Sequence, residues 1–76
     1  MPKITPLKRD KFEAFLIMIG CTLKRTKGDH LVYTKIGFSR PVIIPKDSRV
    51  EIFIIFSNIR TAKISRERYL ELLKNI

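Results

Sequence analysis

The segment Lys24–His30 (Lys-Arg-Thr-Lys-Gly-Asp-His) holds the residue types that acid–base chemistry on a phosphodiester requires. It contains the only histidine of the chain, His30, close to a glycine and to three basic side chains. Histidine is the side chain whose ordinary pKa lets it exchange protons near neutral pH. Basic side chains nearby attract a phosphodiester and stabilise charge that develops on it. The segment therefore points to binding of nucleic acid or to chemistry on it.

A specific role follows for His30 if the substrate is RNA. As a general base it would take the proton of a ribose 2′-hydroxyl, and the oxygen would then attack the adjacent phosphorus. Lys24, Arg25 and Lys27 would neutralise the charge of the phosphorane. Because the chain has no second histidine, water or a lysine must protonate the leaving oxygen. The alternative is a strand-end histidine with an ordinary hydrogen bond, and the residues alone leave both open.

Other chemistries lack the residues they need. One cysteine, Cys21, and one histidine nine residues away are too few ligands for a zinc site, so we expect no metal and no other cofactor. A lone cysteine also excludes an internal disulfide, and its expected place is the core. No glycine-rich loop accompanies Gly28, and no base with an orienting partner supports a serine or cysteine hydrolase.

The charge of the chain indicates a polyanionic partner. Sixteen Lys and Arg oppose seven Asp and Glu, a net charge of +9, and the basic excess is concentrated between residues 24 and 49. Such a surface suits RNA, DNA or an acidic protein, although a merely solvated basic face has the same composition. The residues expected to contact phosphates are Lys24, Arg25, Lys27, Gly28, Arg40 and Lys46. Tyr33 is expected to pack against a helix, with stacking on a base as the alternative.

The length of 76 residues predicts one domain over residues 1–76. The N-terminus lacks the architecture of a signal peptide. The longest uncharged run, Ala14–Leu23, is about half of the ~20 residues that a membrane helix needs. We therefore expect a cytoplasmic protein without a membrane partner. The sequence leaves its oligomeric state open.

The elements that position these residues follow from local signals. Thr5 and Pro6 predict the start of a helix, as hydroxyl cap and first helical residue, and Gly20 predicts its end. One face of this helix carries Phe12, Phe15, Leu16 and Ile19. Three strands are then expected, over residues 22–27, 30–35 and 39–44, with turns at Lys27-Gly28-Asp29 and at Gly37.

The segment Val50–Phe56 is ambiguous, because its composition favours a strand while its apolar spacing also fits a helix. Its run of apolar residues exceeds what one helix face requires, so part of it could lie in an interface. Ser65 is expected to cap a last helix, whose apolar face is formed by Tyr69, Leu72, Leu73 and Ile76.

From about Leu7 to Leu73 the chain resembles the HicA (YcfA-like) toxins. The resemblance is carried by Gly20-Cys21, by Lys24-Arg25-x-Lys27-Gly28-Asp29-His30-Leu31-Val32-Tyr33, and by Arg60-Thr61-Ala62-Lys63-Ile64-Ser65. It implies a small α+β domain of order α-β-β-β-α with a further helix, in which a three-stranded antiparallel sheet has its helices on one face, as in double-stranded-RNA-binding domains. It also implies a metal-independent endoribonuclease that cleaves mRNA, inhibited by a HicB-like antitoxin. The family's essential histidine maps onto His30 and its glycine onto Gly28, and residues 50–61 become a helix.

Three positions depart from the family pattern. Asp29 replaces a serine or threonine, Lys46-Asp47 follows Pro45 where many members have a histidine, and Phe53-Ile54 replaces Gly-Thr. A carboxylate at position 29 could orient the imidazole or repel phosphate. Two other functions therefore remain beside the ribonuclease: a non-catalytic RNA-binding module on the same fold, and a domain whose basic face docks an acidic protein.

Overall fold

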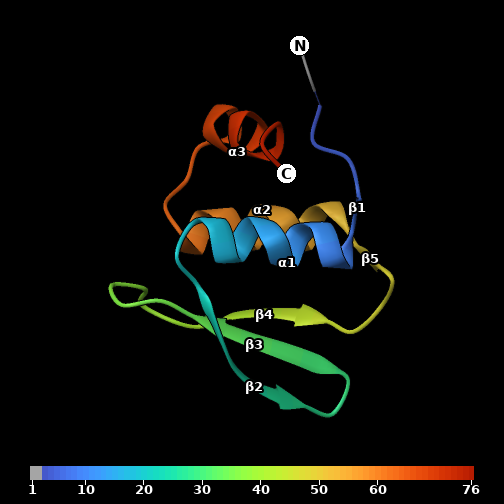
Figure 1. Ribbon diagram of the computed structural model, residues 1–76, viewed down its shortest axis with the longest axis vertical. Coiled ribbons are helices and arrows are strands. Elements are labelled where there is room, and N and C mark those ends of the chain that lie inside the picture. Colours follow the sequence, from blue (N-terminus) through green and yellow to red (C-terminus); the bar gives the residue numbers. More distant parts are fainter. Residues whose placement is uncertain (1–2) are drawn as a thin grey trace.

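The computed structural model describes residues 3–76, which form an α+β domain built around a three-stranded sheet (Figure 1). The elements, in chain order, are β1 (Leu7–Lys8), α1 (Arg9–Met18), β2 (Thr22–Lys27), β3 (His30–Thr34), β4 (Val42–Pro45), β5 (Arg49–Val50), α2 (Ile52–Thr61) and α3 (Arg66–Leu73). The predicted antiparallel sheet is confirmed, with the order β2-β3-β4.

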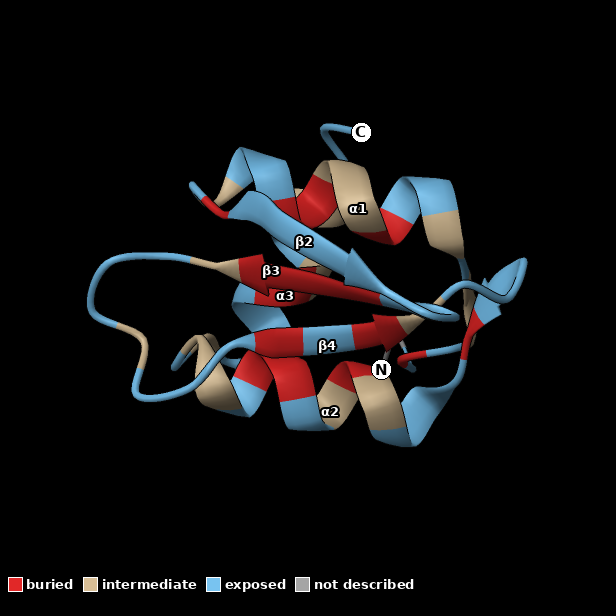
Figure 2. Ribbon diagram, turned by 90° about the horizontal axis from the view of Figure 1, so that it is seen from below, coloured by how far each residue is buried: buried red, intermediate tan, exposed pale blue. Residues whose placement is uncertain are grey.

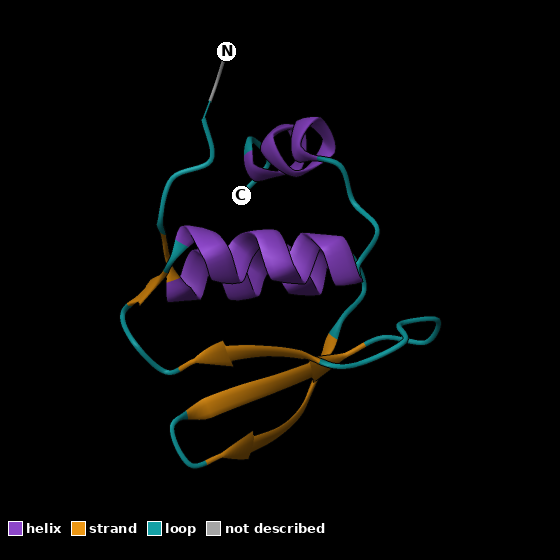
Figure 3. Cartoon of the chain, turned by 180° about the vertical axis from the view of Figure 1, so that it is seen from behind, coloured by secondary structure: helices purple, strands orange, loops and turns teal. Residues whose placement is uncertain are grey.

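The elements are arranged in layers (Figures 1 and 3). α1 and α2 lie side by side against one face of the sheet, and α3 lies across these two helices on the side away from it. β1 and β5 form a separate antiparallel pair beside the start of α1, in which Leu7 pairs with Val50 and Lys8 with Arg49. The other face of the three-stranded sheet is covered by no helix among the described residues (Figure 2).

The core lies between the sheet and α1 and α2, and continues to α3. Side chains of α1, of the covered sheet face and of α2 are buried there, among them Phe12, Phe15, Leu16, Leu31, Tyr33, Val42, Ile44, Ile55 and Ile59. Tyr69 of α3 is also buried, and its ring meets that of Phe15 edge to face with centroids 4.9 Å apart. Burial of a large apolar side chain contributes about 1.5–3 kcal/mol, so these aromatic contacts attach α3 firmly to the domain.

The start of the first helix differs from the prediction. The helix begins at Arg9 and not near Thr5, because residues 7–8 pair with β5. The backbone N–H of Arg9 donates to the carbonyl of Ser48 at 3.0 Å, and Lys8, the residue before the helix, makes no side-chain capping bond. Pairing with a distant strand thus takes the place of the predicted hydroxyl cap.

The end of α1 is confirmed. Gly20 has φ +99° and donates its N–H to Ile17, while Cys21 donates to Leu16 at 2.9 Å. This is the Schellman arrangement, in which a residue in the left-handed region lets the chain satisfy the last carbonyls of a helix. The same arrangement ends α2, where Lys63, with φ +58°, occupies the corresponding position.

The ambiguous segment is a helix for most of its length. Val50 belongs to β5, and α2 begins at Ile52. Ile55 and Ile59 are buried on its inner side, while Phe53 is 72% exposed. Ser65 caps α3 as predicted, its hydroxyl accepting from the N–H of Arg68 at 3.1 Å.

The last of the three predicted strands, β4, is shorter than predicted and begins at Val42. It extends to Pro45, because β4 lies at the edge of the sheet, where a proline removes no hydrogen bond on its free side. No helix formed by residues 3–76 has the length and apolarity needed to cross a membrane.

Candidate nucleic-acid interface

The hairpin between β2 and β3 positions His30. Its two turn residues are Gly28 and Asp29, and Gly28 has φ +59°, as the first central residue of a type II′ turn requires. A Cβ atom at Gly28 would meet nothing within 4 Å, so the glycine serves the turn and not close packing. His30 is therefore the first residue of β3, directly after an exposed turn, and its side chain is 52% exposed.

The imidazole of His30 is paired with the carboxylate beside it. Nδ1 of His30 lies 2.9 Å from Oδ1 of Asp29, whose side chain is 88% exposed. When Nδ1 carries a proton that is donated to this carboxylate, Nε2 of the neutral ring is a proton acceptor. The pair thus presents Nε2 as a base and leaves it accessible at the tip of a hairpin.

Strand register places His30 on the uncovered face of the sheet. Leu31 and Tyr33 of β3 point into the core, so His30 and Val32 point the opposite way. Residues directly opposite in an antiparallel pair share a face. Lys27 and Pro45 are therefore in one row with His30, and Arg25 and Ile43 are in the next row with Val32. We call the surface formed by Arg25, Lys27, His30, Ile43 and Pro45, which surround the buried Val32, the open face; Figure 2 views the sheet from this side.

The structure brings some of the predicted phosphate contacts together and separates others. Arg25 and Lys27 share the open face with His30. Lys46 is also close, because its backbone N–H donates to the carbonyl of Asp29 at 2.7 Å. Lys24 is exposed at the β-bulge that shifts the register between Leu23 and Arg25.

Arg40 does not join this group. It lies in the loop between β3 and β4, which is at the opposite end of the sheet from the hairpin. There its Nε donates to the hydroxyl of Thr61 at the end of α2, at 3.3 Å. Arg40 therefore lies away from His30 and links the loop to a helix.

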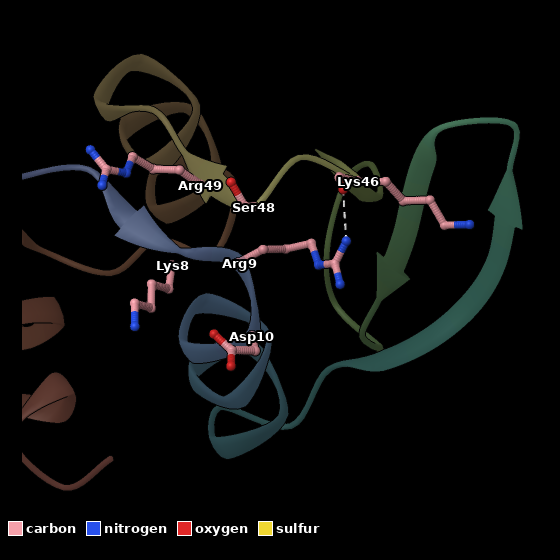
Figure 4. Close-up of a pocket in the computed structure, with 6 residues that line it drawn as sticks. All are labelled: Lys8, Arg9, Asp10, Lys46, Ser48 and Arg49. Carbon is pink, nitrogen blue, oxygen red and sulfur yellow. Dashed lines mark hydrogen bonds between the residues drawn. The ribbon is translucent and has the colours of Figure 1, made fainter.

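Three further basic residues near the hairpin were not among the predicted phosphate contacts. Lys8, Arg9 and Arg49 line, together with Lys46, a hollow of about 480 Å³ at the junction of β1, α1 and the β4–β5 connection, and their side chains extend from it in different directions (Figure 4). We call this site the basic hollow; its lining residues are Lys8, Arg9, Asp10, Lys46, Ser48 and Arg49. The β1–β5 pairing brings together residues about forty positions apart to form this hollow, and no local sequence pattern predicts that pairing.

Arg9 is held at the edge of the basic hollow by a hydrogen bond on one side and an ion pair on the other. Its Nη1 donates to the carbonyl of Lys46 at 2.7 Å, and its Nε lies 3.2 Å from Oε2 of Glu13. The other oxygen of Glu13 accepts from the hydroxyl of Tyr33 at 2.5 Å. Burial, together with this carboxylate, raises the pKa of Tyr33 well above its ordinary value, so the phenol remains a donor. Tyr33 thus packs against a helix, as predicted.

Cys21 lies in the core, as predicted. Burial raises the pKa of its thiol, against the opposing effect of the charge on Lys35. The thiol is therefore poorly suited to act as a nucleophile. Within residues 3–76, no three or more His, Cys, Asp and Glu side chains cluster as ligands for a metal ion would.

No family model, curated protein or solved structure matches this chain. The functional argument therefore depends on the residues and geometry of the hairpin and its basic surroundings.

Proposed function

We propose that this chain is a metal-independent endoribonuclease that cleaves mRNA, and that it is the toxin of a HicA/HicB-type toxin–antitoxin pair. The observation that carries the proposal is the His30–Asp29 pair at an exposed turn, with Nδ1 bound by a carboxylate and Lys27 and Lys46 close by. The resemblance of residues 20–33 and 60–65 to that family supports it. The layered order helix, three strands, helix is also the order of a double-stranded-RNA-binding-like fold.

The cleavage step would use the RNA's own ribose as nucleophile. Nε2 of His30 takes the proton of a 2′-hydroxyl, and the 2′-oxygen forms a bond to the adjacent phosphorus. The bond from phosphorus to the 5′-oxygen breaks, and this oxygen receives a proton from water. The products are a 2′,3′-cyclic phosphate and a 5′-hydroxyl. Lys27, in the same row as His30, lies where it can stabilise the charge of the phosphorane.

A non-catalytic RNA-binding module is the second candidate. It is favoured by the single histidine of the chain, which leaves no second imidazole to protonate the leaving oxygen. The exposed carboxylate of Asp29 also repels a phosphate that approaches the hairpin. In this second function the open face binds the RNA backbone, and His30 only contacts a phosphate or a base.

The inhibitor of such a toxin would have to cover the open face. Since Arg25, Lys27 and His30 lie on it, we propose a HicB-like antitoxin with acidic side chains at its contact surface. Binding of the antitoxin only to the α3 side of the domain would contradict this part of the proposal.

Induced expression in a bacterial host tests the proposed activity. The wild type is expected to arrest growth and to leave cleaved mRNA, and His30→Ala is expected to do neither. Because His30 is half-exposed, the substitution should leave the fold intact, which circular dichroism of the purified proteins checks. Cleavage in the presence of a chelator distinguishes a metal-independent enzyme. If wild type and His30→Ala are equally harmless and bind RNA equally well, the binding module is the correct function.

A further inference from the structure

The basic hollow collects positive charge that the protein itself does not neutralise. Four of its six lining residues are cationic and one, Asp10, is acidic. Among the described residues, Lys8, Lys46 and Arg49 form no ion pair, and Arg9 alone is paired, with Glu13. Because like charges gathered at one site repel each other, such a cluster is stabilised when an anion binds it.

The cationic donors at the hollow belong to the side chains of its lining residues. At the start of α1 two backbone donors are already used, because the N–H of Arg9 is bonded to Ser48 and that of Lys11 to the carboxylate of Asp10. Nη1 of Arg9 donates to the carbonyl of Lys46 and Nε is in an ion pair with Glu13, while neither Nε nor Nη2 makes a hydrogen bond within residues 3–76. A planar guanidinium fixed in this way is suited to a phosphate. The hydroxyl of Ser48 offers a further donor at the same hollow.

The hollow adjoins the hairpin that carries His30. Lys46 is common to both, since it lines the hollow, its side chain extends toward the strands of the hairpin (Figure 4), and its backbone N–H is bonded to the carbonyl of Asp29. Pro45, the residue before it, pairs with His30. One polyanion can therefore contact the hollow and the hairpin at the same time.

We propose that the basic hollow binds a backbone phosphate of the RNA strand, next to the phosphate at His30, and so fixes the register of the strand on the open face. This inference builds on the proposed function and adds a second binding site to it, formed by Lys8, Arg9, Lys46 and Arg49. Contacts of this kind position a nucleic acid without reading its sequence.

The experiment measures binding of a short fluorescent single-stranded RNA to the His30→Ala protein, which cannot consume its ligand. Each lost phosphate contact lowers the slope of log K against log salt by about 0.7 for a single strand. In this background Lys8→Gln and Arg49→Gln are therefore each expected to lower the slope by this amount, which corresponds to about fivefold weaker binding at about 0.1 M salt. Arg49→Lys, which keeps the charge, is expected to retain most of the affinity. The matched control is Lys74→Gln, which removes one exposed charge beside α3 and should leave the slope unchanged.

The other outcomes identify which part of the account fails. If Lys8→Gln and Arg49→Gln bind like the parent while Lys27→Gln binds less tightly, RNA contacts the open face only, and the basic hollow is not a site. If the parent binds no RNA at all, the inference and the proposed function fall together. If the hollow variants weaken binding but the wild type never cleaves, the site stands and the activity fails.

Discussion

The hydroxyl of Tyr33 donates a 2.5 Å hydrogen bond to Oε1 of Glu13, which lies twenty residues earlier in the chain. The second oxygen of the same carboxylate lies 3.2 Å from Nε of Arg9. One side chain of α1 is therefore shared between the central strand of the sheet and a guanidinium of the basic hollow. The contacts of Glu13 therefore serve both to pack the sheet on α1 and to position Arg9 at the hollow.

Removal of the Tyr33 hydroxyl should destabilise the domain. Tyr33→Phe keeps the buried ring but deletes the hydrogen bond to the Glu13 carboxylate, which is partly shielded from water. We therefore expect the free energy of unfolding to fall by about 1.5 kcal/mol. For a chain of this length the melting temperature should fall by about 6–12 °C. Thermal unfolding followed by circular dichroism measures it.

Tyr69→Phe is the matched control. The hydroxyl of Tyr69 is buried and has no hydrogen-bond partner within residues 3–76, so its removal should be neutral or stabilising. Equal destabilisation by the two substitutions would show that the bond from Tyr33 to Glu13 contributes nothing.

Both tyrosines of the chain should resist ionisation while the protein is folded. Burial raises the pKa of Tyr69 to about 12, and burial with the Glu13 bond raises that of Tyr33 still further. Because the ordinary pKa is about 10, the unfolded chain loses these protons first. The stabilising effect is therefore complete below about pH 10 and is lost as the pH rises toward the folded-state values.

Absorbance of tyrosinate during an alkaline titration checks this prediction. The signal should appear together with the loss of the circular dichroism of the fold, and the urea-unfolded chain should titrate near pH 10. Tyrosinate with a midpoint near 10 in a protein that is still folded would contradict it.

The sequence predicted those features that depend on neighbours along the chain. Gly20, the Gly28 turn and the Ser65 cap act over a few residues, and all three occur where they were expected. The apolar spacing of α1 was also sufficient to select its buried face, because the period of a helix is repeated three times there.

Features that depend on distant pairing were missed. The short strand β1 exists only because Leu7 meets Val50, and this pairing also moves the start of α1 to Arg9. The basic hollow forms through the same pairing, so no local pattern could predict that Lys8 and Arg9 lie near Arg49. Arg40 was predicted to contact phosphates together with the residues of the hairpin, because it is close to these strands in the sequence. In the structure it lies at the opposite end of the sheet.

A glycine at the end of α2 should stabilise the domain. Lys63 has φ +58°, a conformation that costs a residue with a Cβ atom roughly 1–2 kcal/mol, part of which is offset by the greater flexibility of glycine in the unfolded chain. Lys63→Gly is therefore expected to gain up to about 1 kcal/mol, measured by urea unfolding. Gly20→Ala, at the equivalent position after α1, should change stability in the opposite direction. Loss of stability in Lys63→Gly would contradict this account of the α2 terminus.

Replacement of Asp29 by asparagine should slow the cleavage of RNA and tighten its binding. Asp29→Asn removes the charge that orients Nδ1 of His30, so the turnover number should fall, by less than the ~10²–10⁴-fold loss expected of His30→Ala. The same substitution removes a negative charge from the hairpin, so KM should fall as well. Steady-state cleavage of a labelled RNA separates the two constants. An unchanged turnover number with a lower KM would mean that Asp29 only repels the substrate and does not position His30.

Asp10 is the one acidic residue of the basic hollow, and its replacement should tighten RNA binding. Asp10→Asn removes a repulsive charge from an exposed position, which corresponds to about two- to fivefold in affinity at low salt and to less at high salt. Glu67→Gln is the matched control, because Asp10 and Glu67 are both acidic residues in the first turn of a helix and both lose the same favourable interaction with the helix dipole. Only Asp10 lines the hollow, so only Asp10→Asn should bind the RNA more tightly in the His30→Ala background. An equal gain from Glu67→Gln would show that the RNA responds to net charge alone and that the hollow holds no phosphate.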